Sequence, residues 1–212
     1  VASKKTGFRM RDPEIAGHPI DLVGRTDEVG ALVEHAMGLF EPNAGGSAVV
    51  VSGVAGIGKT RLVREMLRSL DERDERMWLE ASRCTTGDEA GPYAPFAQAL
   101  RQRVRVVSSD DGEAIRLKTR AFIQRLEVKD EAQADALESA LVGLLAGHVR
   151  EDSVMGQAAQ RGQFFENMAT LYELMARVQP LLVLIDDFHF SSSATRDLLA
   201  FVAGRVRDVP VL

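Results

Sequence analysis

Gly53-Val54-Ala55-Gly56-Ile57-Gly58-Lys59-Thr60 is the stretch that decides the fold of this 212-residue chain. It satisfies the pattern G-x-x-x-x-G-K-[ST], which roughly one chain in a hundred of this length would contain by chance. The glycines allow positive φ, so that backbone N–H groups can point into one concavity and hold phosphate oxygens. Lys59 adds a charge for the β- and γ-phosphates, and Thr60 can give its hydroxyl to Mg²⁺. The stretch predicts a nucleotide site, and binding without hydrolysis stays open.

The flanks of this loop have the patterns that the motif requires. Residues 48–51, Ala-Val-Val-Val, form a short apolar run rich in β-branched side chains, which predicts a strand. Residues 59–70 predict a helix, and we include Arg61, in its first turn, among the nucleotide-binding residues. Strand, loop and helix therefore follow one another in the order that a phosphate-binding loop needs.

Two adjacent carboxylates, Asp186 and Asp187, follow the most apolar run of the chain, residues 181–185. Such a run predicts a central parallel strand, and ligands bind at the carboxyl ends of parallel strands. We expect Asp186 to coordinate Mg²⁺ and Asp187 to orient or deprotonate an attacking water. An acidic pair can also be a mere polar strand end, but its position after a phosphate-binding loop favours the functional interpretation. His189 is either a sensor of the γ-phosphate or metal, or a local hydrogen-bonding group.

The remaining pattern alternates strands with helices. We predict a strand at residues 77–82 and the start of another at residue 209; the other helices are expected at residues 26–40 with Thr26 as N-cap, 95–105, 113–126, 131–146, 160–179 and 194–207. This order implies an α/β domain with right-handed crossovers. The expected fold class is a three-layer P-loop NTPase: a mainly parallel sheet flanked by helices, with a helical insertion between the second strand and the strand that ends in the acidic pair.

The composition of the chain argues against nucleic acid and membranes as partners. The net charge of −5 is the opposite of the basic footprint that nucleic-acid binding favours, although a cationic cluster occurs at residues 101–105 and 116–120. No run approaches the roughly 18 apolar residues of a membrane span, and the first residues lack a secretory signal. We therefore expect a cytoplasmic chain without membrane or direct nucleic-acid contacts. Its single cysteine, Cys84, is expected to be a buried apolar residue.

Several further segments resemble the Walker-motif ATPase domains of the STAND group. The resemblance is strongest to the AAA-type ATPase module of large LuxR-type regulators and of class III adenylate or guanylate cyclase fusions. Residues 22–28, Leu-Val-Gly-Arg-Thr-Asp-Glu, resemble that family's opening V-G-R-x-x-E box, which implies that Val23, Gly24 and Arg25 lie near the base and ribose. Residues 92–95 are similar to its P-Y-x-P segment after the second strand. Residues 186–190 resemble its D-D-x-H-W box, with Phe190 in place of Trp and Ser192 where relatives commonly carry Asp.

The resemblance implies ATP or ADP with Mg²⁺ as cofactors and slow hydrolysis that resets a regulatory switch. It also implies attached output domains, either a cyclase or a DNA-binding domain, and possible self-association. Residues 1–21 would then be an arm from a preceding domain, and residues 22–212 an ATPase domain cut short before its sensor and lid segments. The strand from residue 209 would lie between the two motif strands. Two alternatives stay open: a non-hydrolysing scaffold that binds protein partners, and an origin-recognition or clamp-loader type ATPase.

Overall fold

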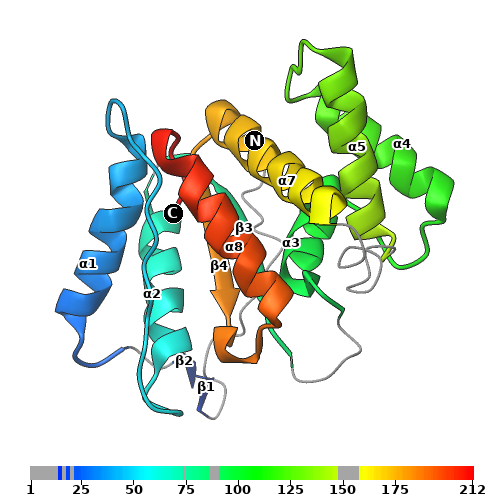
Figure 1. Cartoon of the computed structure of the whole chain (residues 1–212). Helices are drawn as coiled ribbons and strands as arrows, with labels where there is room; N and C mark the ends of the chain where they lie inside the picture. Colours follow the sequence, from blue (N-terminus) through cyan, green and yellow to red (C-terminus); the bar gives the residue numbers. More distant parts are fainter. Residues whose placement is uncertain (1–13, 16–17, 20–21, 74, 86–90, 148–157) are drawn as a thin grey trace.

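The computed structural model describes residues 14–15, 18–19, 22–73, 75–85, 91–147 and 158–212 (Figure 1). Two short strands, β1 (Glu14–Ile15) and β2 (His18–Pro19), pair antiparallel, and the rest of the predicted arm lies outside the described residues. The order continues with α1 (Thr26–Met37), η1 (Gly38–Phe40), α2 (Lys59–Asp71), β3 (Trp78–Arg83), α3 (Ala94–Val104), α4 (Gly112–Gln124), α5 (Glu131–Leu145), α7 (Ala158–Val178), β4 (Leu181–Asp186), η3 (Phe188–Phe190), α8 (Ser193–Arg205) and η4 (Val206–Asp208).

A small parallel sheet lies at the centre of the chain. β3 and β4 pair in parallel, in a register that runs from Trp78 opposite Leu181 to Arg83 opposite Asp186. On the other edge of β4, Leu181 forms a parallel bridge with Val211, and the Leu181 amide donates to the Pro210 carbonyl at 2.9 Å. The described sheet is therefore parallel, as predicted, with helices flanking it.

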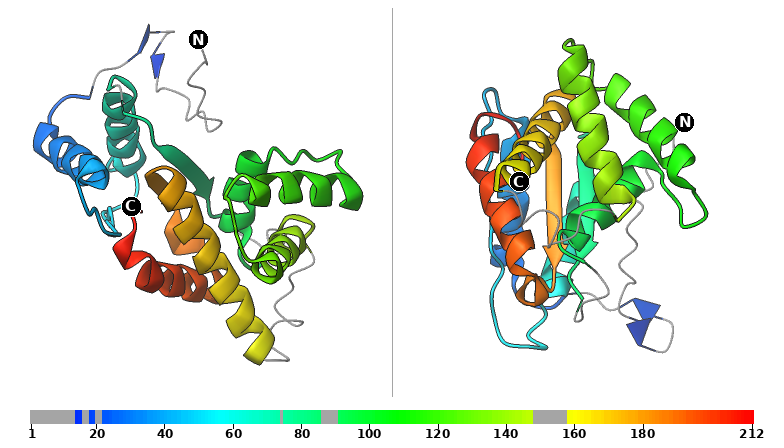
Figure 2. Two further views of the ribbon diagram at one scale, coloured as in Figure 1. Left: turned by 90° about the horizontal axis from the view of Figure 1, so that it is seen from above. Right: turned by 45° about the vertical axis from the view of Figure 1, so that its right-hand side comes forward.

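Successive side chains of β4 enter two different apolar cores. Leu181 belongs to a large core that also takes side chains from α3, α4, α5, α7 and α8, whereas Leu182 belongs to a smaller core with α1 and α2. Neighbouring residues of a strand point to opposite faces, so the two cores lie on opposite sides of the sheet. The left view of Figure 2 shows α1 and α2 on one side of β3 and α7 and α8 on the other.

The apolar stripe predicted on α7 is confirmed as core, with one correction. Its side chains from Phe164 to Met175 are at most 8% exposed. Val178, the last residue of the helix, is 52% exposed, because the stripe there has passed the edge of the large core. In the described parts of the chain, no helix is both long and apolar enough to cross a membrane.

The strand predicted at residues 48–51 is wrong for this structure. The chain approaches the sheet there, since the amides of Gly46 and Ser47 donate to the carbonyls of Arg207 and Val211, both at 2.9 Å. A β-carbon on Gly46 would overlap the Val206 carbonyl, so this close approach requires glycine. After Ser47 no regular ladder forms, and Val49 and Val50 are 41% and 85% exposed, so burial does not favour a strand at these β-branched residues.

Three predicted element ends also need correction. The strand expected from residue 209 is a single parallel bridge between Val211 and Leu181, because the chain only leaves η4 at Asp208. The helix expected to reach residue 207 ends at Arg205 and tightens into η4. Thr26 is not the N-cap of α1: that position is Arg25, with φ of 59°, and its guanidinium, which has no acceptor, forms no cap hydrogen bond.

Candidate phosphate- and metal-binding site

The phosphate-binding loop adopts the left-handed backbone that its glycines allow. Gly56 has φ 78° and Gly58 φ 98°, and Gly58 is the N-cap residue of α2. A β-carbon at either position would meet no atom within 4 Å. Glycine is therefore favoured at both positions because of the positive φ and not because of a lack of space. The loop therefore leads directly into a helix N-terminus, whose first N–H groups lack helical partners and favour an anion.

Lys59 is held over its own loop. Its Nζ donates to the carbonyl oxygens of Gly53 at 3.0 Å and Val54 at 3.1 Å. The ammonium is thus positioned at the mouth of the loop, where its charge adds to that of the helix N-terminus. A phosphate oxygen that binds there would replace two neutral carbonyl partners by a charged one, which forms the stronger hydrogen bond.

Thr60 and Asp186 bring the two predicted motifs into contact. The Thr60 hydroxyl, on the first turn of α2, lies 3.3 Å from Asp186 Oδ1 and 3.5 Å from Oδ2, at the carboxyl end of β4. Figure 1 shows that β4 points toward the end of the molecule at which α2 begins. A hydroxyl and a carboxylate are oxygen ligands of the kind that Mg²⁺ takes together with nucleotide phosphates. The pair therefore fits the metal role that the sequence predicted for it.

Asp187 lies in a turn that orients it separately from Asp186. Its φ of 53° and ψ of 37° are left-handed, and its carbonyl accepts from the Phe190 amide at 2.9 Å to close η3. Its amide donates to Asp186 Oδ1 at 3.0 Å. The side chain is 39% exposed and thus open to a water molecule. His189 is exposed, and its ring centroid lies 3.8 Å from that of Phe190.

Arg83 is a site residue to which the sequence analysis assigned no role. From the end of β3 its Nη2 lies 2.7 Å from Asp186 Oδ2, and its Nε lies 3.5 Å from Asp187 Oδ2. The hydrogen bond to Asp186 raises the pKa of the guanidinium; burial opposes this, and the charges of the two carboxylates add to it. The parallel register places residue 83 opposite residue 186, so correct pairing of the two predicted strands is the signal that would have revealed it.

The predicted base-binding residues are not joined to the loop by described contacts. Val23 is 92% exposed, and Gly24 and Arg25 have φ of 75° and 59° in the turn before α1. Arg25 uses its carbonyl to accept the Val29 amide at 3.1 Å. Since α1 packs against α2, the segment precedes a helix that neighbours the loop, and its role toward the base stays a prediction.

Other predicted residues have structural surroundings. Arg61 is partly buried in the first turn of α2. Cys84 is buried, as predicted, and the pKa of its thiol is raised, first by burial and then by the charges of Asp187 and Asp186. The thiol is therefore neutral at physiological pH and fits a packing role.

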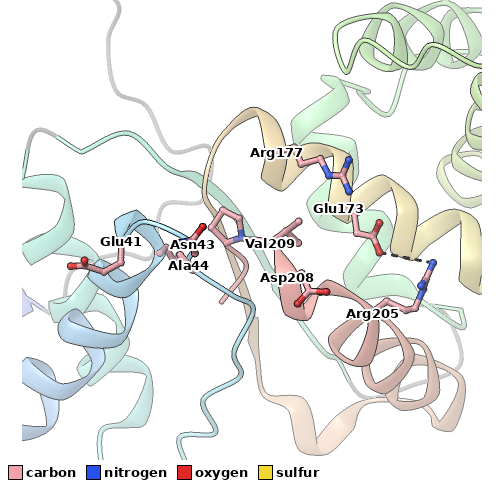
Figure 3. A pocket seen from close by; sticks show the side chains of 10 residues that line it. Glu41, Asn43, Ala44, Glu173, Arg177, Arg205, Asp208 and Val209 are labelled. Atoms are coloured by element: carbon pink, nitrogen blue, oxygen red, sulfur yellow. Dashed lines mark ion pairs between the residues drawn. The ribbon is translucent and has the colours of Figure 1, made fainter.

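A cavity of about 650 Å³ lies apart from this site (Figure 3). Its wall includes the charged residues Glu173, Arg177, Arg205 and Asp208. Nη2 of Arg205 lies 4.0 Å from Oε1 of Glu173. None of the predicted nucleotide-binding or metal-binding residues lines it. The candidate site is thus the open edge formed by the loop, Asp186 and Arg83 and not this cavity.

Comparisons with known proteins identify the family of this chain. A family model described as the AAA ATPase domain matches residues 21–212, which include the loop and the acidic pair. An uncharacterized protein of Rhizobium meliloti (strain 1021), R02095, is 28% identical over 167 residues, which cover 79% of this chain and 16% of that protein. No solved structure matches the chain significantly. The chain is a member of the AAA ATPase domain family of nucleotide-binding proteins.

Proposed function

We propose that this chain is an ATP-binding and slowly hydrolysing module that acts as a nucleotide-dependent switch in a larger protein. The contact between Thr60 and Asp186, next to the loop that carries Lys59, is the observation that carries the proposal. Lys59, Thr60 and Asp186, the side chains that a triphosphate and its metal need, thus lie together at one edge of the sheet. The matched relative is about six times as long as the aligned segment, which supports a role as one module among others.

The residues of the loop fit the phosphates of ATP. Gly56 and Gly58 let the loop amides face a common anion, and Lys59 exchanges its carbonyl partners for the β- and γ-phosphates. Thr60 and Asp186 hold Mg²⁺, which neutralises charge on the phosphate oxygens when bound. We place the sheet in a three-layer P-loop architecture in which α3, α4 and α5 form an insertion between β3 and β4.

Asp187 carries the hydrolytic part of the proposal. Its half-exposed carboxylate, fixed by a tight turn at the strand end, orients the attacking water and takes its proton. Val23, Gly24 and Arg25 contact the base. ATP and ADP favour different conformations of the chain because only the triphosphate contacts both α2 and β4. This difference in contacts shifts the population between the two conformations.

The scaffold alternative differs in one respect, since it needs binding but not turnover. The nucleic-acid alternative is weakened because several cations of the cluster at residues 101–105 and 116–120 form ion pairs within the chain. Arg103 pairs with Glu80, Lys118 with Asp110 at 2.6 Å, and Arg120 with Glu138 at 2.7 Å, so these charges are neutralised within the chain. Neutralised charges contribute little to phosphate-backbone binding.

Hydrogen–deuterium exchange in MgATP, in MgADP and without nucleotide tests the switch. The proposal predicts slower exchange at the start of α2 in both nucleotides, and additional slowing at the end of β4 only in MgATP. Lys59→Ala should remove both changes. Identical protection in MgATP and MgADP would contradict the switch and favour the scaffold.

A further inference from the structure

Arg83 forms ion pairs with both acidic residues of the site. Because β3 and β4 are parallel and in register, its guanidinium reaches the Asp186 and Asp187 carboxylates, 2.7 Å from one and 3.5 Å from the other. Its side chain is 45% exposed, so it can leave the pair without unpacking a core. The acidic pair thus already has a monovalent counter-charge supplied by the neighbouring strand.

The oxygens of Asp186 have a donor on each side. Oδ2 accepts from Arg83, Oδ1 accepts from the Asp187 amide at 3.0 Å, and the Thr60 hydroxyl lies within 3.5 Å of both. A cation that coordinates this carboxylate must therefore displace a donor or share the carboxylate with one. Of these donors Arg83 alone is charged, and two positive charges at one carboxylate repel each other.

We propose that Arg83 is a positioning residue that competes with Mg²⁺ for the acidic pair and so sets the Mg²⁺ concentration at which the site loads nucleotide. The inference rests on the proposed function. Without metal, the single charge of Arg83 offsets part of the negative charge of Asp186 and Asp187 and holds their carboxylates at the strand ends. When Mg²⁺ binds with the nucleotide, Arg83 withdraws from Asp186 and stays with Asp187 or turns to solvent.

If Arg83 instead binds a phosphate directly, replacing it should have a different effect on nucleotide binding. In that case its removal would weaken ATP binding more than ADP binding and would not reduce the Mg²⁺ requirement. A merely structural ion pair would change stability alone. The direction of the change in Mg²⁺ dependence therefore separates the three roles.

The test is the Mg²⁺ concentration that gives half-maximal ATP binding, measured by calorimetry for the wild-type chain, Arg83→Gln and Arg83→Lys. Arg83→Gln should lower this midpoint about three- to tenfold, since a partly exposed charge is screened by solvent. Arg83→Lys keeps the charge and should stay near the wild type. Arg120→Gln is the matched control, because Arg120 also bridges two carboxylates, Glu138 at 2.7 Å and Asp135 at 3.9 Å, but on α4 and α5.

A second readout needs no nucleotide. Mn²⁺ binding followed by electron paramagnetic resonance should tighten in Arg83→Gln, and circular dichroism should show that the variant is folded. An unchanged or raised Mg²⁺ midpoint in a folded Arg83→Gln chain that still binds ATP would overturn the role of Arg83. A wild-type chain that binds no ATP would instead overturn the proposed function, and unchanged Mn²⁺ affinity would then overturn this inference as well.

Discussion

Thr60 and Asp186 are 126 residues apart in the sequence, yet the hydroxyl of one lies 3.3 Å from the carboxylate of the other. The contact exists because α2 begins directly after the loop while β4 ends at the same edge of the sheet. It places an oxygen pair suited to Mg²⁺ beside the positive end of a helix, where an anion is favoured. This juxtaposition links the two motifs of the site.

The torsion of Gly58 should be essential for phosphate binding. Gly58→Ala forces a side chain into φ 98°, which costs at least about 1–2 kcal/mol, although no atom blocks the added methyl group. We expect ATP affinity, measured by calorimetry, to fall about tenfold or more while the chain stays folded.

The matched control is Gly30→Ala, in the interior of α1, where an added β-carbon also meets no atom. A helical glycine replaced by alanine should gain roughly 0.5–1 kcal/mol of stability without altering affinity. Equal ATP affinity of the two variants would show that the loop conformation is not required.

Asp187→Asn should separate binding from turnover. Asparagine is isosteric and tolerates the left-handed backbone at φ 53°, so the turn into η3 should be preserved. Loss of the proton acceptor should reduce the rate of phosphate release about 10²-fold or more, with ATP affinity within a few-fold of the wild type. Phosphate release and calorimetry measure the two quantities. Unimpaired hydrolysis by this variant would exclude Asp187 as the residue that activates water.

Glu80 should make the stability of the fold depend on pH. It lies on β3 and is 1% exposed, and its Oε2 has no hydrogen-bond partner among the described residues. Burial raises its pKa to about 7, against the opposing charge and hydrogen bond of Arg103. The folded state therefore binds this proton more tightly than the unfolded state, so the contribution is fully present below about pH 4.5 and is lost as the pH rises through 7.

In the wild type, the free energy of unfolding should fall by on the order of 3 kcal/mol at most as the pH rises from about 4.5 through 7. In Glu80→Gln this fall should be much smaller. Urea denaturation at a series of pH values measures the slope. Glu166→Gln serves as control, because Glu166 forms an exposed pair with Arg205 at 3.3 Å. A wild-type slope retained in Glu80→Gln would show that Glu80 is not the group responsible.

Local patterns predicted most elements of this fold. The apolar run before Asp186 and the glycine spacing before Lys59 depend on neighbours in sequence, and β4 and α2 appear where these patterns place them. Residues 48–51 show the limit of such patterns. A strand needs a partner beside it, and here regular pairing stops at Ser47, so β-branched side chains alone do not produce a strand.

Arg83 shows a second limit. Its importance depends on the register between β3 and β4, which are far apart in the sequence, with α3, α4, α5 and α7 between them, and no local signal distinguishes it from other strand-end arginines. The role of Arg25 as N-cap in place of Thr26 is a third case. There the backbone torsion of the preceding turn overrides the preference of threonine for the N-cap.

The most direct test of the central claim is calorimetric titration of the chain with ATP and ADP, with and without Mg²⁺, compared with Lys59→Ala. Lys129→Ala, on an exposed residue between α4 and α5, is the control for loss of a lysine charge. We predict Mg²⁺-dependent binding of ATP that Lys59→Ala weakens about 10- to 100-fold, as expected for loss of a charged hydrogen bond to phosphate. A folded wild-type chain that binds neither nucleotide, or binds both as well without Lys59, would contradict the account.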